Sequence, residues 1–337
     1  MSVPADIRAV LRSRAAACGG KMSFRDFSEI ALFDPAFGYY RQKRKRVGRA
    51  AGTDFYTASS LGEVFGRLVA NAAQTLLGVA KEELRGYALV EIGAEPGQTH
   101  FDALHGRFAE IRAVRLGDAL EIPEKAVVFA NELFDAQPFH RLVSRAGTWE
   151  ECGVEEDPRE PGAWRETRLD ALSSDALKAF AADVPAPAED GWRLDVPLDA
   201  EPLLKKILAG NWRGAAIFPD YGKTVADCLD AYPEGTARAY FRHSQSNALT
   251  FAPGEQDLTC HVLWDRLKPI FPACGFSAGT VLRQEAFFMK FAREEIGRIV
   301  AGTSPEAARE RAVLTELLHP AKMGHAFQVL FGTRPQR

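Results

Sequence analysis

The amino-acid sequence lacks several features that would place it quickly in a class of proteins. Its five cysteines are scattered among 337 residues with no C-x-x-C pair, which argues against a disulfide framework or a structural zinc site. No apolar run approaches the roughly 18 residues that span a bilayer, and residues 1–20 lack the apolar stretch of a signal peptide. These absences predict a protein of the cytoplasm, or of an equivalent reducing compartment, without membrane insertion.

The chain also has no large excess of one charge. Its 42 Lys and Arg residues face 45 Asp and Glu residues, a formal net charge of −3, whereas binding to nucleic acid or to a membrane surface favours a strong basic excess. We therefore expect no nucleic-acid partner. The exception is a basic run over residues 41–49, which would suit an acidic protein partner at least as well.

Motifs for several common chemistries are absent too. No H-E-x-x-H or similar spacing of metal ligands occurs, so we expect no metal. No G-x-S-x-G elbow of a serine hydrolase occurs either. Gly222-Lys223-Thr224 copies the end of a phosphate-binding loop, but Ile217 stands where that loop requires glycine. Hydrolase and nucleotide triphosphatase chemistry are therefore not supported.

What the chain does have is the patterning of a globular α/β protein. Hydrophobic residues make up 46% and charged residues 26% of it, which is ordinary for a soluble fold. The pattern of residues 1–82 predicts a helical N-terminal part that carries the basic loop. One helix is expected to begin after Ser23 and another to span residues 60–80. After Gly86, short apolar runs alternate with helical stretches, as in a parallel sheet. The expected strands are 87–92, 111–116, 126–130, 214–218 and 326–331, and the expected helices include 99–108, 200–209 and 262–274.

An insertion interrupts this pattern. Two strand-like runs flank Ala146-Gly147 as in a β-hairpin, and a stretch rich in proline and acidic residues follows them. We therefore predict an α/β core over 83–138 and 198–337, with an inserted α+β lobe over 139–197.

Polar residues follow the expected strands of the core. Residues 91–97 (EIGAEPG) form a glycine-containing turn from a strand into a helix, which can bring backbone N–H groups close to a ligand. A plain turn is an equally open interpretation, because the dinucleotide fingerprint G-x-G-x-x-G is absent. Residues 131–136 (NELFDA) follow the next strand, and ligands of open α/β sheets bind at such strand ends. Two carboxylates and an amide there could hold a guanidinium or an amine; the alternative is a solvated helix start capped by Asn131.

Two further polar segments are candidates for the same site. Asp220-Tyr221-Gly222 again follows a strand, and Asp257-Leu258-Thr259-Cys260-His261 combines with Arg242-His243. Two histidines beside Asp257 suggest the wall of a site, although a lone histidine is usually structural.

Together these motifs resemble those of the MidA-like S-adenosylmethionine-dependent methyltransferases, a family that includes the mitochondrial complex I assembly factor that methylates a protein arginine. The matching segments follow the family order over nearly the whole chain: residues 31–35 (ALFDP), 38–40 (GYY), 54–57 (DFYT), 91–94, 131–136, 220–222, 235–236, 242–243, 257–262 and 323–324.

The resemblance implies a class I methyltransferase fold, which is a Rossmann-like sheet, and S-adenosyl-L-methionine as cofactor. It also implies a protein acceptor methylated on an arginine side chain, with a respiratory-complex subunit as one such partner. By the resemblance, the residues that bind the cofactor are Asp54, Thr57, Glu91, Gly93, Gly97, Asp102 and Asp118, and the catalytic residues are Asn131, Glu132, Asp135 and His261.

Two departures from the family pattern bear on activity. Glu95-Pro96 interrupts the glycine-rich loop, and residues 98–125 leave room for only one helix and one strand before the strand at 126–130. We expect the sheet to lack one strand and favour the second as the missing one. Asp118 would bind the ribose if the remaining strand were the second, or the adenine if it were the third. A family member that assembles complexes or binds proteins without cofactor is the alternative function.

Overall fold

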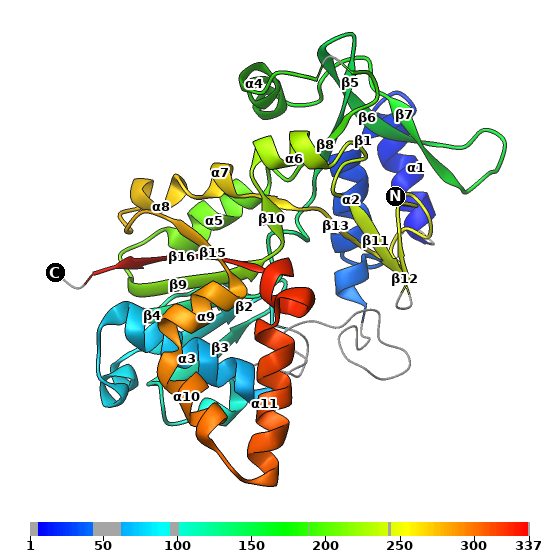
Figure 1. Cartoon of the computed structure of the whole chain (residues 1–337). Helices are drawn as coiled ribbons and strands as arrows, with labels where there is room; N and C mark the ends of the chain where they lie inside the picture. Colours follow the sequence, from blue (N-terminus) through cyan, green and yellow to red (C-terminus); the bar gives the residue numbers. More distant parts are fainter. Residues whose placement is uncertain (1–5, 43–61, 95–100, 188, 242–243, 336–337) are drawn as a thin grey trace.

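The computed structural model describes residues 6–42, 62–94, 101–187, 189–241 and 244–335, and a six-stranded sheet forms its centre (Figure 1). The strand order is β15-β16-β9-β4-β2-β3. The parallel strands are β2 (Ala88–Ile92), β3 (Glu110–Val114), β4 (Lys125–Ala130) and β9 (Arg213–Asp220), and the antiparallel ones are β16 (Gln328–Arg334) and β15 (Thr280–Arg283). β2 is buried along its whole length and β4 and β9 at every residue but the first, which explains their continuous apolar sequences.

Helices cover both faces of this sheet. One face packs against α3 (Glu63–Leu77), α9 (Gln284–Phe291), α10 (Arg293–Ala301) and α11 (Pro305–Leu318). The other face packs against α5 (Ala200–Leu208), α7 (Trp264–Leu267) and α8 (Ile270–Ala273). Sheet faces buried by helices on both sides are the expected arrangement of a Rossmann-like fold, and the predicted fold class is confirmed.

A second sheet lies in the upper part of the molecule (Figure 1). Its order is β1-β6-β5-β8, and β7 pairs antiparallel with β6 outside this path. The strands are β1 (Lys21–Ser23), β5 (His140–Arg145), β6 (Thr148–Glu156), β7 (Trp164–Arg168) and β8 (Arg193–Val196), accompanied by α4 (Asp175–Asp183). The predicted hairpin turns at Ala146 and Gly147, which have φ values of 48° and 72°.

The N-terminal residues are shared between the two sheets. β1 pairs with β6 of the inserted segment, and α1 (Ile7–Ala17) and α2 (Phe24–Phe33) pack in the same core as Val154 and Trp164. By contrast, α3 packs against the central sheet. The division of the chain at residues 82, 138 and 197 stays a prediction.

Several local predictions can be compared with the structure. α2 begins as expected, with the Ser23 side chain accepting from Asp26 N at 3.0 Å. The helix expected over 99–108 is wrong for the described residues 101–108, which contain only the short 3₁₀ helix η4 (Asp102–Leu104) and turns. The helix expected over 262–274 is divided into β14 (Val262–Leu263), α7 and α8, because Pro269 cannot donate a helical hydrogen bond.

The prediction for the strand before β4 is wrong. We expected this strand to be the third of the fold and the second to be missing. β3 is the next strand after β2 along the chain and pairs with it directly, residue by residue from Ala88↔Glu110 to Ile92↔Val114. β3 therefore takes the place of the second strand, and the strand without a counterpart among the described residues is the third. The expectation that only one strand fits between residues 98 and 125 is confirmed for the described part of that segment.

The small sheet β12-β11-β13 lies between the two larger sheets in Figure 1. It consists of β11 (Arg238–Phe241), β12 (Ser244–Ser246) and β13 (Asp257–Thr259). Leu258 of β13 belongs to the same core as α2, so this sheet brings C-terminal residues against the N-terminal helices. Among the helices in the described ranges, none is both long and apolar enough to cross a membrane.

Candidate functional site

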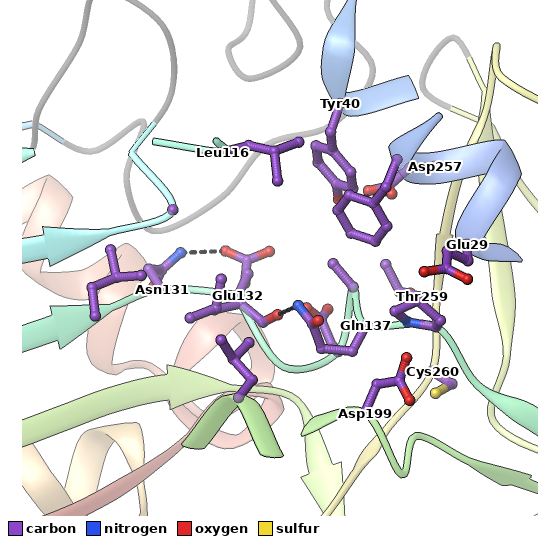
Figure 2. Close-up of a pocket in the computed structure, with 18 of the residues that line it drawn as sticks. Glu29, Tyr40, Leu116, Asn131, Glu132, Gln137, Asp199, Asp257, Thr259 and Cys260 are labelled. Atoms are coloured by element: carbon purple, nitrogen blue, oxygen red, sulfur yellow. Dashed lines mark hydrogen bonds between the residues drawn. The ribbon is translucent and has the colours of Figure 1, made fainter. Parts of the chain in front are cut away.

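A cavity of about 770 Å³ opens at the carboxyl ends of β2, β4 and β9. Its lining comes from the central sheet, from α2 and the 3₁₀ helix η1 (Tyr39–Arg41), and from the small sheet that contains β11 and β13. Figure 2 shows polar side chains from these separate elements pointing into one space. The volume lies in the range of small-molecule sites.

The segment that follows β4 supplies acidic groups to this cavity. Glu132 has a φ of 51°, a left-handed conformation that is unusual for a side chain other than glycine. Its backbone N–H donates to Pro219 O at 3.0 Å, and Asn131 Nδ2 donates to its Oε1 at 2.6 Å. Strained backbone of this kind is concentrated at functional sites, because it must be held by its surroundings.

Asp220, at the end of β9, fixes the backbone of this segment by hydrogen bonds. Its buried carboxyl accepts from Phe134 N at 2.8 Å and from Tyr221 N at 2.7 Å. Burial raises the pKa of Asp220 to about 7, although these backbone hydrogen bonds act in the opposite direction. Asp220 is therefore a positioning residue for the loop over 131–136.

Glu132 and Asp135 are the two acids of the loop that line the cavity. Burial, reinforced by the nearby Asp220 and Asp257, raises the pKa of Glu132 to about 8. The same causes, together with Glu132 itself, raise the pKa of Asp135 well above its usual value. Asp135 is 4% exposed, and its Oδ1 has no hydrogen-bond partner among the described residues. The site therefore holds acids that burial keeps largely protonated near neutral pH and that no ion pair with a cation of the described residues stabilises in the charged form.

The opposite wall comes from η1, β11 and the segment after β13. Tyr40 Oη donates to Asp257 Oδ1 at 2.8 Å. His261 N donates to Thr236 Oγ1 at 3.1 Å, and burial lowers the pKa of the His261 side chain to about 4. His261 is therefore neutral at physiological pH and adds no positive charge to the cavity.

The end of the cavity near β2 and β3 has the backbone shape of a nucleotide site. Gly93 follows β2 with a φ of 79°, and a Cβ there would lie 3.2 Å from Leu133 Cδ1. Asp118 lies on the exposed turn after β3, where its Oδ2 accepts from Arg115 N at 2.8 Å. Apolar Ile92, Ala94 and Leu116 line the same end. A flat group could lie between these apolar contacts, with Asp118 within reach of hydroxyls.

The structure brings six of the eleven predicted site residues to the cavity. They are Gly93, Asp118, Asn131, Glu132, Asp135 and His261. Glu91 is buried within β2 and is not part of the lining. Asp102 is exposed on η4, 3.8 Å from His105. Asp54, Thr57 and Gly97 lie outside the described residues, as do Glu95 and Pro96.

Several lining residues were missing from the predicted set. Asp257 and Tyr40 both belong to motifs noticed in the sequence, and their position in those motifs was the available signal. Thr236, in the turn before β11, likewise belongs to the matching segment 235–236. Arg238 and Tyr240 line the cavity from β11, a short strand with no distinctive pattern. Among the described residues, no group of three or more His, Cys, Asp or Glu is arranged to hold a metal ion.

Comparison with known proteins identifies the family. Residues 66–280, more than half of the chain, match the sequence model of the family described as "Putative S-adenosyl-L-methionine-dependent methyltransferase". The chain belongs to this family. It is a methyltransferase, and its cofactor is S-adenosyl-L-methionine.

Individual relatives are more distant. The chain is 23% identical to the "Protein arginine methyltransferase NDUFAF7, mitochondrial" of Danio rerio, over 92% of this chain and 82% of that protein. It is 24% identical to the protein of the same name from Xenopus laevis, over 59% of this chain and 44% of that one. Its fold is similar to a crystal structure from Burkholderia thailandensis bound to S-adenosyl-homocysteine, with a TM-score of 0.84, 24% identity, and coverage of 97% and 92%.

The described part of the site fits this cofactor. The glycine after β2, the apolar contacts around it and the acid after β3 offer what a nucleoside with an amino-acid tail requires. When bound, the cofactor supplies an electrophilic methyl group on a sulfonium.

Proposed function

We propose that this methyltransferase acts on the guanidinium of a protein arginine. The observation that carries the proposal is the pair of acids Glu132, which is partly buried, and Asp135, which is buried; both line the cavity, and no ion pair joins either of them to a lysine or arginine of the described residues. An acceptor that arrives as a planar cation with several N–H donors would complement them. The name of the Danio rerio relative supports the same acceptor.

The acids would act by orientation and by taking up a proton. Paired hydrogen bonds that the guanidinium donates to the carboxylates of Glu132 and Asp135 would fix its plane and aim one nitrogen at the methyl group. As the N–C bond would form and the S–C bond of the sulfonium would break, that nitrogen must lose a proton. Glu132, with a pKa of about 8, would accept the proton in its ionised form, whose share increases as the pH rises from 7 through 8. His261, being neutral, would line the site without opposing the cation.

The cofactor would bind at the end of the cavity formed by β2 and β3. We assign Gly93 to close backbone approach and Asp118 to the ribose hydroxyls, because β3 occupies the place of the second strand. Glu91 and Asp102 do not line the cavity, so we assign them no direct contact. Asp54, Thr57 and Gly97 stay predictions.

The acceptor protein and the compartment belong to the proposal as well. A protein partner follows from the arginine acceptor, and a respiratory-complex subunit is one candidate. The cytoplasmic location expected from the sequence stays a prediction. The names of the relatives say mitochondrial for those proteins.

The test is to identify the methylated residue. The purified protein is incubated with methyl-labelled S-adenosylmethionine and a protein extract, the extract is hydrolysed, and methylarginine is separated from methyllysine. We expect methylarginine with the wild type, and at least about a 100-fold loss with Asp135→Asn, while affinity for S-adenosylhomocysteine is kept. Glu316→Gln, a surface acid paired with Lys322, is the matched control. Label on another residue type would refute the proposal, and failure of the wild type to bind cofactor would favour the cofactor-free alternative.

A further inference from the structure

One wall of the cavity comes from residues that precede the segment matched by the family. α2 contributes Glu29 and Phe33 to the lining, and η1 contributes Tyr40, whereas the family match begins at residue 66. In Figure 2, Tyr40 lies across the cavity from Glu132 and Gln137. This wall faces the acids of the loop after β4.

The aromatic pair in this wall is held firmly. The rings of Phe33 and Tyr40 are stacked, with centroids 5.4 Å apart and planes inclined by 20°. Tyr39, which is fully buried, meets Tyr40 edge-on at 5.1 Å. The Tyr40 hydroxyl donates to Asp257, a side chain that is 3% exposed. Ring and hydroxyl are therefore positioned before a ligand arrives.

Acids from two other elements surround these rings. Asp257 comes from β13, and Asp135 comes from the loop after β4, where its buried Oδ1 has no donor among the described residues. Burying such an atom unpaired is unfavourable, so a donor on a ligand in the cavity would stabilise it. The positive side chain of Arg238 also lines the cavity, but it donates to the carbonyls of Gly235 and Ala237.

Aromatic faces and in-plane acids distinguish two common cations. A guanidinium is flat, so it can stack on a ring while its N–H groups donate to carboxylates in its own plane. An ammonium has no flat face and presents its donors in a cone. The aromatic rings and carboxyl groups of this wall therefore fit a guanidinium better than an ammonium.

We propose that the stacked Phe33–Tyr40 pair, together with Asp257, forms the platform that selects a guanidinium over an ammonium as methyl acceptor. This inference rests on the proposed function and adds the residues that set its specificity. Its aromatic part, Phe33 and Tyr40, belongs to the N-terminal segment outside the part of the chain matched by the family, whereas Asp257 lies inside that part.

The experiment uses Nα-acetyl-arginine methylamide and the corresponding blocked lysine as probes. Each is titrated into the full-length protein saturated with S-adenosylhomocysteine, and each is assayed as a methyl acceptor. We expect the wild type to favour the blocked arginine at least tenfold. Tyr40→Leu should weaken its binding about tenfold or more, and Phe33→Leu and Tyr40→Phe about threefold each, while S-adenosylhomocysteine affinity stays within twofold. Phe251→Leu, an exposed aromatic outside the cavity lining, is the control and should change neither affinity.

The outcomes separate this inference from the proposed function. If the wild type methylates arginine and all three cavity variants keep its affinity and its preference over lysine, the platform is refuted and the proposed function stands. If the wild type methylates a different residue type, both fail. Should Tyr40→Leu not fold, the milder Tyr40→Phe and Phe33→Leu decide the matter, and unchanged affinity in both refutes the platform.

Discussion

Two groups of acidic residues in this protein differ in their ion pairs. In the inserted lobe, the buried Asp195 lies 3.3 Å from the guanidinium of Arg141, and Glu166 pairs with Arg141 and Arg193; we call these four residues the lobe cluster. In the cavity, Glu132, Asp135 and Asp220 form what we call the cavity cluster, and all three have raised pKa values. The lobe cluster contains its own arginines, whereas no ion pair joins the cavity cluster to a lysine or arginine of the described residues.

This difference separates structural acids from functional ones. Asp195 also accepts from the backbone N–H groups of Thr236 and Ala237, at 2.7 Å each. It therefore ties the lobe to the turn before β11, which lines the cavity through Thr236. A charge that is paired within the chain can link two parts of the fold in this way. A charge that is left unpaired destabilises the fold and is typical of sites that bind a cationic ligand.

The largest expected effect is on the stability of the lobe cluster. Arg141→Met removes the cation beside Asp195, whose carboxyl is buried, and breaking a buried pair costs about 3–5 kcal/mol. Urea denaturation should show this loss in the free energy of unfolding. Arg141→Met combined with Asp195→Asn should recover part of it. A loss below about 1 kcal/mol would show that the two groups of acids are not different in kind.

The next effect is on activity and comes from the cavity cluster. Glu132→Gln keeps the shape but removes the proton acceptor and one charge, so kcat/KM should fall about 100-fold, equivalent to about 2.7 kcal/mol. Because desolvation and the neighbouring carboxyls disfavour its charged form, replacement of this acid should not lower the melting temperature at pH 8.5. Lower stability together with full activity would reverse our assignment.

The cavity cluster should also make the protein sensitive to pH. Glu132 and Asp220 have pKa values of about 8 and about 7 in the folded state, above their ordinary values of 4.5 and 3.8. The native state thus binds more protons than the unfolded state from about pH 4 to 8, so the free energy of unfolding should fall as pH rises through this window. Over pH 6.5–8.5, kcat/KM should rise about 25-fold as Glu132 loses its proton.

Glu132→Gln provides the control for both pH profiles. It should flatten the rise in kcat/KM and weaken the decline in stability, as followed by thermal unfolding across the same buffers. A wild-type stability that increases from pH 5 to 8 would contradict the raised pKa values.

The smallest effect is expected at an acid that belongs to neither group. Asp118 is exposed on the turn after β3, so water screens its charge and it requires no cation. Asp118→Asn should weaken S-adenosylhomocysteine binding about two- to fivefold, by loss of hydrogen bonding to the ribose, and calorimetric titration can measure this. Asp102→Asn, on the exposed 3₁₀ helix outside the cavity lining, should leave the affinity unchanged. If the two substitutions change the affinity equally, Asp118 does not bind the ribose.

Much of the central sheet could be predicted because its signals are local. β2, β4 and β9 are continuous apolar runs, as buried parallel strands must be. The assignment of β3 failed because the partner of a strand is not written in its own residues: the run at 110–114 is compatible with either of two places in a sheet, and only its pairing with β2 decides between them. The interruption of the helix expected over 262–274 could have been predicted from Pro269. The apolar periodicity of that segment favoured one continuous helix instead.

The sequence by itself determined the strand-forming runs, the polar motifs at their ends and the family, since each depends on residue types at short spacing. Only the tertiary structure decided which of those motifs share a cavity. Tyr40 and Asp257 are 217 positions apart, yet they are joined by a hydrogen bond. Their meeting depends on α2 packing in the same core as Leu258 of β13, a long-range contact that no local pattern encodes. That no ion pair joins Glu132 or Asp135 to a lysine or arginine within the described ranges likewise becomes visible only in the tertiary structure.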